Sequence, residues 1–183
     1  YDVLYISDEV VTGFGRLGHW FASEAGFGIV PDIITVAKGI TSGYVPLGAV
    51  LISERLIKEV GGEPDRGASF ANGFTYSGHP VACAAALANL DVIEKDQMLE
   101  NAREVGPYLQ EKLQELIDIP MVGDVRGVGL MGCLECVVSK ESRQPLQLDY
   151  DVGKRIDSHC QALGLLLRPL INMCVVSPPI IIS

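Results

Sequence analysis

Two apolar, strand-like segments of this chain each lead directly into a charged residue. The first spans Asp2 to Val10, is expected to form a short buried strand, and ends at Asp8 and Glu9. The second spans Asp32 to Val36 and stops at Lys38. In an open α/β sheet, ligands bind outside the carboxyl ends of the strands. We therefore expect an α/β fold in which Asp8 and Lys38 face one crevice.

Further elements continue this α/β pattern. Leu47 to Ser53 is expected to form a third strand. A long helical segment follows His79, and Pro80 suits its first turn. The pair Gly106-Pro107 should kink this segment or divide it in two, and Ile119-Pro120 should end it.

The remainder of the chain has an α+β pattern. A strand is expected near Leu130 to Val138, a helix from about Val152 to Leu163, and one or two strands after that helix. A domain boundary is expected inside the long helical segment, near residues 95 to 105. The predicted organisation is residues 1–100 as part of one domain and residues 101–183 as part of a second.

Composition excludes several classes of partner. Hydrophobic residues make up 48% of the 183 residues and charged residues 20%, a balance that supports a folded core. The net charge of −9 argues against nucleic acid or an acidic membrane surface as a partner. The longest apolar stretch, Leu163 to Ile182, is interrupted by Arg168 and three prolines, so it is not a membrane span. No targeting segment is visible, and we expect a cytoplasmic location.

The five cysteines do not form a recognisable disulfide framework, because they are odd in number and irregularly spaced. Cys133 and Cys136 form a C-x-x-C motif, which could in principle be a redox or metal pair. On the strand expected there, residues three apart point to opposite faces. We interpret both thiols as small apolar fillers and expect no metal site.

Four long motifs carry a family resemblance. They are Asp8–Arg16 (DEVVTGFGR), Pro31–Gly39 (PDIITVAKG), Gly43–Val50 (GYVPLGAV) and Phe74–Pro80 (FTYSGHP). Together they resemble the class III aminotransferases, also called ω-amino-acid or amine aminotransferases, of the type I pyridoxal-phosphate transferase fold. The resemblance implies that the chain is the C-terminal half of a longer protein. It would comprise part of a large, doubly wound sheet domain and an incomplete small C-terminal α+β domain.

Pyridoxal phosphate needs the two kinds of group that stand at the strand ends, an amine and an acid. The resemblance implies that Lys38 holds the cofactor as a Schiff base and also moves the substrate proton. It implies that Asp8 pairs with the pyridine nitrogen and that Val10 packs against a face of the ring. The spacing of Asp8 and Lys38 alone is unspecific, and a surface ion pair is the alternative. For Val10 the alternative is plain core packing.

Three further residues receive roles from the resemblance. Thr75 would bind the cofactor phosphate of the neighbouring subunit, which implies at least a homodimer, and Phe74 would line the same pocket. The alternative for Thr75 is a helix-capping or turn residue. Arg168 would bind the carboxylate of a substrate, because a planar guanidinium suits a bidentate contact, and a structural salt bridge is its alternative. Arg126 is interpreted as structural.

The predicted function is amino transfer from an amine or ω-amino acid to a keto acid, with pyruvate as the expected acceptor. The motif from Lys38 to Gly48 resembles the pyruvate-dependent amine and β-alanine group. The alternatives are an aminomutase or a decarboxylating aminotransferase on the same scaffold, and a non-catalytic relative that serves as an assembly partner. We expect the 183-residue polypeptide alone to be inactive, because part of the family's site would lie outside it.

Overall fold

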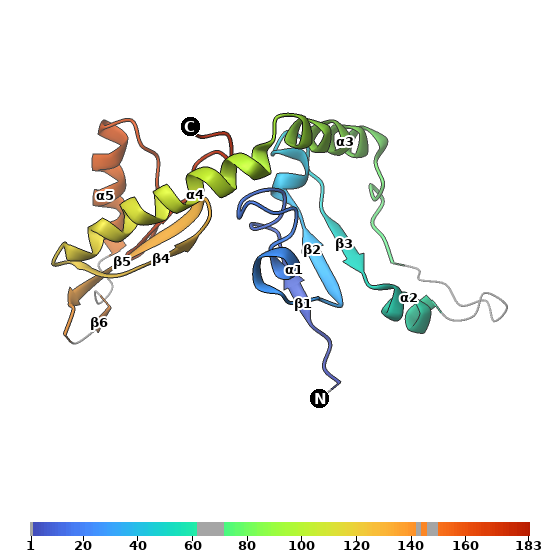
Figure 1. The fold of residues 1–183 in the computed structure, drawn as a ribbon, viewed down its shortest axis with the longest axis horizontal. Helices are drawn as coiled ribbons and strands as arrows, with labels where there is room; N and C mark the ends of the chain where they lie inside the picture. The colour runs from blue at the N-terminus through green and yellow to red at the C-terminus, as the bar shows by residue number, and fades with distance from the viewer. Residues whose placement is uncertain (1, 62–71, 142–143, 146–149) are drawn as a thin grey trace. The chain divides into compact units, whose positions relative to one another are not determined.

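The computed structural model describes residues 2–61, 72–141, 144–145 and 150–183 (Figure 1). The chain forms two compact units. The first comprises Tyr1–Gly15 and His19–Gln97, and the second comprises Arg16–Gly18 and Met98–Ser183. The polypeptide therefore passes from one unit to the other three times, after residues 15, 18 and 97.

The first unit is built on a small mixed sheet with strand order β1-β2-β3. β1 and β2 are parallel, whereas β2 and β3 are antiparallel. The parallel register places Ile6 opposite Ile33 and Asp8 opposite Thr35. In chain order its elements are β1 (Ile6–Asp8), α1 (Ala22–Phe27), β2 (Ile33–Val36), η1 (Lys38–Thr41), β3 (Ala49–Ile52), α2 (Glu54–Gly61) and α3 (Pro80–Lys95).

The three expected strands and the helix after His79 are present in this unit, with Pro80 in the first turn of α3. The expected burial of the first strand is wrong. Val3 is 77% exposed and Ile6 is 56% exposed. In the described chain β1 has a neighbouring strand on one side only, and Val3 lies before its first residue. The short helix α2 was not among the expected elements.

The second unit is built on an antiparallel sheet with strand order β4-β5-β8-β7, and β6 pairs with β5. Helix α4 packs against β4 and β5, and α5 packs against β7 and β8. In chain order its elements are α4 (Met98–Gln114), η3 (Glu115–Asp118), β4 (Val122–Val128), β5 (Met131–Ser139), β6 (Gln144–Pro145), α5 (Tyr150–Ala162), β7 (Arg168–Leu170) and β8 (Met173–Val176).

The long helical segment divides at a different place from the one expected. The break lies at Gln97, which has φ 51°, and α4 continues through Gly106 and Pro107. Gly106 serves packing here, because a Cβ built on it would lie 3.0 Å from the Cα of Gly129 in the β4–β5 turn. Of the two outcomes expected for this pair, a kink or a division, the division is therefore wrong.

The tripeptide Arg16–Gly18 is held tightly within the second unit. The Arg16 guanidinium donates to the carbonyls of Leu130, at 3.2 Å, and Pro178, while the Leu130 N–H donates to the Arg16 carbonyl at 3.0 Å. Burial lowers the pKa of Arg16. Gly129 has φ 57°, and a Cβ on it would lie 2.8 Å from the Cα of Leu17, so glycine is required at that turn. Strand β4 was missed from the sequence, because glycines at 123 and 127 remove the alternation that marks a strand.

Candidate active site

The first unit brings Asp8 and Lys38 to the same edge of its sheet. Asp8 is the last residue of β1, and Lys38 follows two residues after the end of β2. The two strands are parallel, Asp8 is opposite Thr35, and the Glu9 N–H donates to the Thr35 carbonyl at 2.9 Å. Parallel neighbours end at the same edge, which is where ligands bind in α/β sheets. Asp8 and Lys38 are both exposed.

The two adjacent carboxylates at the end of β1, Asp8 and Glu9, have opposite environments. Asp8 is exposed, and its carboxylate accepts a hydrogen bond from the Val10 N–H at 3.0 Å. Glu9 is 1% exposed. Its carboxylate accepts from the N–H groups of Ala22 at 2.8 Å and Ser23 at 2.7 Å, at the start of α1. Val10 itself is half-buried in the turn that follows.

Hydrogen bonding determines the charge state of Glu9. Burial by itself raises the pKa of a carboxyl, but the N–H groups of Ala22 and Ser23 and the hydroxyl of Thr12 outweigh it and lower the pKa of Glu9. The Thr12 hydroxyl donates at 2.8 Å. A charged Glu9 therefore anchors the turn after β1 to the start of α1, and this anchor leaves Asp8 as the carboxylate at the sheet edge.

Lys38 stands in a constrained backbone segment. Its φ of 44° lies in the left-handed region, which residues other than glycine rarely occupy. Such conformations persist only where surrounding contacts impose them, and they cluster at functional sites. Next to it, a Cβ built on Gly39 would lie 3.0 Å from the Cβ of Phe14 and 3.1 Å from the Gly13 carbonyl. The glycine-rich turn after β1 thus packs directly against the segment that carries Lys38.

Asn89 is a supporting residue that the sequence analysis missed. Its side-chain amide donates to the carbonyls of Gly39 at 2.8 Å and Ile40 at 3.2 Å, and so ties α3 to η1. Asn89 lies on the helix face that also carries the buried residues Ala86 and Ile93. A polar residue on an apolar helix face needs a hydrogen-bond partner, and that pattern was the available signal.

Thr75 and Phe74 lie in a turn that precedes α3. The Phe74 N–H donates to the Ser77 hydroxyl at 2.9 Å, and the Ser77 N–H donates to the Phe74 carbonyl at 2.9 Å. Thr75 is exposed, and its hydroxyl bonds to none of the residues that the structure describes. His79 occupies the N-cap position of α3, so Thr75 does not cap the helix. Phe74 is 87% exposed.

Arg168 is the first residue of β7 and belongs to the second unit. It is exposed, and within the described ranges it forms no ion pair or hydrogen bond through its side chain. The structural salt bridge that was the alternative role for Arg168 is thus not found among the described residues. Arg126, in contrast, is structural as interpreted: it pairs with Asp124 at 2.5 Å and Glu135 at 2.7 Å. The hydrogen bonds that Arg126 donates to the two carboxylates raise the pKa of Arg126.

The cysteines are free thiols in the described part of the chain. Burial raises the pKa of Cys133 and Cys136, and it raises the pKa of Cys174 to about 11, which disfavours the reactive thiolate. No cluster of three or more potential metal ligands occurs among the described side chains. In the same residues, every helix is too short or too polar to cross a bilayer.

Comparison with known proteins identifies the family of this chain. Residues 1–183 match the family model described as aminotransferase class-III. The chain belongs to the class III aminotransferase family, as its motifs predicted.

Individual relatives match over the full length of the chain. Putrescine–pyruvate aminotransferase of Pseudomonas aeruginosa is 43% identical over 184 residues, which cover 100% of this chain and 39% of that protein. Gamma aminobutyrate transaminase 2 of Solanum lycopersicum is 40% identical, over 100% of this chain and 40% of that protein. The chain spans about two fifths of the length of these relatives.

Solved structures of the same class share the fold. A PMP-bound aminotransferase from Vibrio fluvialis has a TM-score of 0.92 and 39% identity, over 100% of this chain and 40% of its own. The ω-transaminase of Pseudomonas jessenii in complex with PMP has a TM-score of 0.91 and 38% identity, with coverage of 100% and 40%. These likenesses confirm the predicted α/β, type I transferase fold.

Proposed function

We propose that the whole protein containing this chain transfers an amino group from an amine or ω-amino acid to a keto acid, with pyruvate as acceptor, using pyridoxal phosphate. The observation that carries this proposal is the placement of Asp8 and Lys38 at one edge of the sheet in the first unit. The names of the relatives support the substrate class, since one is a putrescine–pyruvate aminotransferase and another a gamma aminobutyrate transaminase.

The residues at this edge fit pyridoxal phosphate by their chemistry. An exposed amine, Lys38, would hold the cofactor, and the exposed carboxylate of Asp8 would keep the pyridine nitrogen protonated. The half-buried Val10 would pack against the ring. The Thr75 hydroxyl, which has no partner in the described residues, would bind the phosphate of the neighbouring subunit's cofactor. When bound, the cofactor supplies a ring that accepts electrons from the substrate carbon.

The chain's own residues would supply proton transfer and orientation. The Lys38 amine would take the proton from the substrate carbon and then donate it to a carbon of the cofactor. This task requires a well-placed amine, and the bonds from Asn89 to Gly39 and Ile40 hold the backbone beside it. Arg168 would bind the substrate carboxylate, for which a free guanidinium is required.

The proposal includes at least a homodimer, in which Thr75 and Phe74 act at the neighbouring subunit's cofactor. Phe74 and Tyr76, on either side of Thr75, are 87% and 81% exposed. Aromatic side chains this exposed are typical of surfaces that a partner covers. We also propose that residues 1–100 belong to the large cofactor-binding domain and residues 101–183 to the small C-terminal domain. The expected cytoplasmic location stays a prediction.

Dependence on an external acceptor tests the reaction class. With the whole protein and cofactor, we expect an amine or ω-amino acid to lose its amino group only when pyruvate is added, with alanine formed in equal amount. Chromatography of all four compounds would check this. Rearranged product without pyruvate would indicate an aminomutase, release of carbon dioxide would indicate a decarboxylating enzyme, and no turnover with any donor would contradict the proposal.

Replacing Arg168 with alanine is expected to raise the KM for pyruvate by about 10- to 100-fold, because a charged, bidentate contact is lost. The KM for an amine without a carboxylate should change less than about twofold. Arg168→Lys is the matched control, since it keeps the charge but not the planar fork, and it should give an intermediate KM for pyruvate. Equal effects of Arg168→Ala on both substrates would contradict the carboxylate role.

A further inference from the structure

One face of the second unit's sheet carries a row of side chains that joins Arg126 to Arg168. The strand register places Arg126 opposite Cys133, Cys133 opposite Val175, and Val175 opposite Arg168. Residues directly opposite one another on neighbouring strands share a face. The two arginines therefore occupy the two ends of one cross-strand row. The adjacent row on this face, which we term the arginine face, comprises Asp124, Glu135, Met173 and Leu170.

Helices α4 and α5 pack on the opposite face of this sheet. A Cβ built on Gly132, in the row next to Cys133, would overlap the Leu113 side chain of α4. A Cβ built on Gly153 of α5 would lie 3.0 Å from the Cβ of Pro169. Because side chains alternate along a strand, these contacts place the arginine face on the side away from both helices. Arg126 and Arg168 are accordingly exposed.

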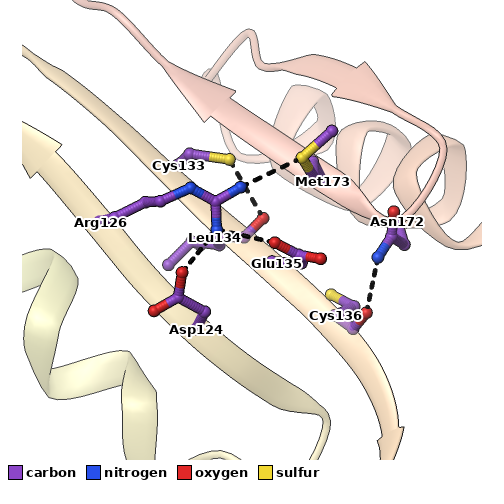
Figure 2. Close-up of polar contacts among 8 residues, drawn as sticks. All are labelled: Asp124, Arg126, Cys133, Leu134, Glu135, Cys136, Asn172 and Met173. Atoms are coloured by element: carbon purple, nitrogen blue, oxygen red, sulfur yellow. Dashed lines mark hydrogen bonds and ion pairs between the residues drawn. The ribbon is translucent and has the colours of Figure 1, made fainter. Parts of the chain in front are cut away.

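Arg126 engages both carboxylates of the arginine face (Figure 2). Its guanidinium bonds to Asp124 at 2.5 Å and to Glu135 at 2.7 Å, and it also contacts the sulfur of Met173 at 3.4 Å. Arg168 on the same face has no carboxylate partner among the described residues. The acids of the sheet that lie on the same face as Arg168 are thus already paired with Arg126.

The register also brings Glu135 within reach of Arg168. Glu135 lies two strands and two residues away, which corresponds to about 12 Å between Cβ atoms at ordinary strand spacing. Extended arginine and glutamate side chains together with one hydrogen bond span that distance. The geometry is held in place by Asn172, whose side-chain amide donates to the Cys136 carbonyl at 3.0 Å while the Cys136 N–H donates to the Asn172 carbonyl at 2.8 Å. An unpaired Glu135 could therefore capture Arg168.

We infer that Arg126 is a positioning residue that engages Glu135 and Asp124 and thereby leaves Arg168 free to bind a substrate carboxylate. The inference rests on the carboxylate role proposed for Arg168 above. Arg126, Asp124 and Glu135 would then take part in substrate selection in addition to joining β4 to β5. An unpaired Glu135 would compete with the substrate for Arg168 and repel an anion that approaches it, whereas Asp124 lies one strand further away.

The test compares steady-state kinetics of the whole holoenzyme and its variants. Arg126→Met retains the length of the side chain and removes the charge, and it should raise the KM for pyruvate by about three- to tenfold, since two nearby acids are released. The KM for an amine without a carboxylate, and kcat, should change less than about twofold. Adding Glu135→Gln to Arg126→Met removes the competing charge and should bring the KM for pyruvate back to within about twofold of the wild type.

Two controls separate this inference from folding and from the proposed function. Arg126→Lys should stay folded and pair with only one of the two acids, so it should give a smaller rise in KM and carries the test if Arg126→Met is not stable. An unchanged KM for pyruvate in the Arg126 variants, or no restoration by Glu135→Gln, would overturn the inference while Arg168→Ala still raised that KM. An unchanged KM in Arg168→Ala itself would instead remove the carboxylate role on which the inference depends.

Discussion

Replacing Lys38 with alanine in the whole protein is expected to lower kcat for amino transfer by at least about 10³-fold, because one amine would both hold the cofactor and transfer the proton. The local backbone supports this role: Lys38 has φ 44°, and Asn89 anchors the two carbonyls that follow it. The measurement is the single-turnover rate with saturating amine. The visible absorbance of the bound cofactor should also change, which gives a readout that does not depend on turnover.

Two controls make the result specific to this lysine. Lys58→Ala removes an exposed lysine of α2 that pairs with Glu54 at 2.7 Å, and it should leave activity within about twofold of the wild type. Lys38→Arg keeps a positive charge but lacks a nucleophilic amine, so it should be as inactive as Lys38→Ala. Borohydride treatment of the wild type should link the cofactor to the peptide containing Lys38. A cofactor linked to another lysine would refute the assignment.

Replacing Glu9 with glutamine is expected to lower the free energy of unfolding by about 2–4 kcal/mol. Glu9 is buried, and its two carboxylate oxygens accept three hydrogen bonds, from Ala22, Ser23 and Thr12. A glutamine amide offers one acceptor oxygen only, and its NH₂ group cannot accept a hydrogen bond from the donors on the other side. Urea unfolding of the whole protein would measure the loss. Amide hydrogen exchange at the start of α1 would locate it, with faster exchange expected at Ala22 and Ser23.

The effect of Glu9 has a defined pH dependence. The folded protein lowers the pKa of Glu9 below its ordinary value of 4.5, so the stabilisation is fully present above pH 4.5 and is lost as the pH falls through the folded pKa. The difference in stability between wild type and Glu9→Gln should therefore be constant near neutral pH and shrink in acid.

The matched control is Glu24→Gln. Glu24 is an exposed glutamate in the first turn of α1, and its replacement should change the free energy of unfolding by less than about 1 kcal/mol. Equal losses for the two variants, or a difference from wild type that grows in acid, would contradict the assigned role of Glu9.

Local pattern was sufficient to predict the elements that carry the site. The strand ending at Val36 was found from its apolar run, and the start of α3 was found from Pro80, because both signals act within a few residues. Burial was not predictable in the same way. Val3 and Ile6 are apolar side chains typical of an interior strand, yet both are exposed in the described chain, where β1 has a neighbouring strand on one side only.

Supporting contacts that bridge distant segments could not be predicted from local pattern. Asn89 bonds to carbonyls 49 and 50 residues earlier in the chain, and no local signal identifies those partners. The same limitation applies to Gly106, which packs against Gly129 and does not interrupt its helix as a Gly-Pro pair predicts. In both cases the deciding contact joins segments that meet only after folding.

The amino-acid sequence alone determined the family, the order of the charged strand ends, and the residue types available for chemistry. Only the tertiary structure decided that Asp8 faces outward while Glu9 is buried, and that Arg126 rather than Arg168 pairs with Glu135. Asp8 and Glu9 differ because successive residues at a strand end point in opposite directions, and helices and strands from elsewhere in the chain choose which side becomes interior. Arg126 pairs with Glu135 because the strand register places it one strand away, whereas Arg168 lies two strands away on the same face.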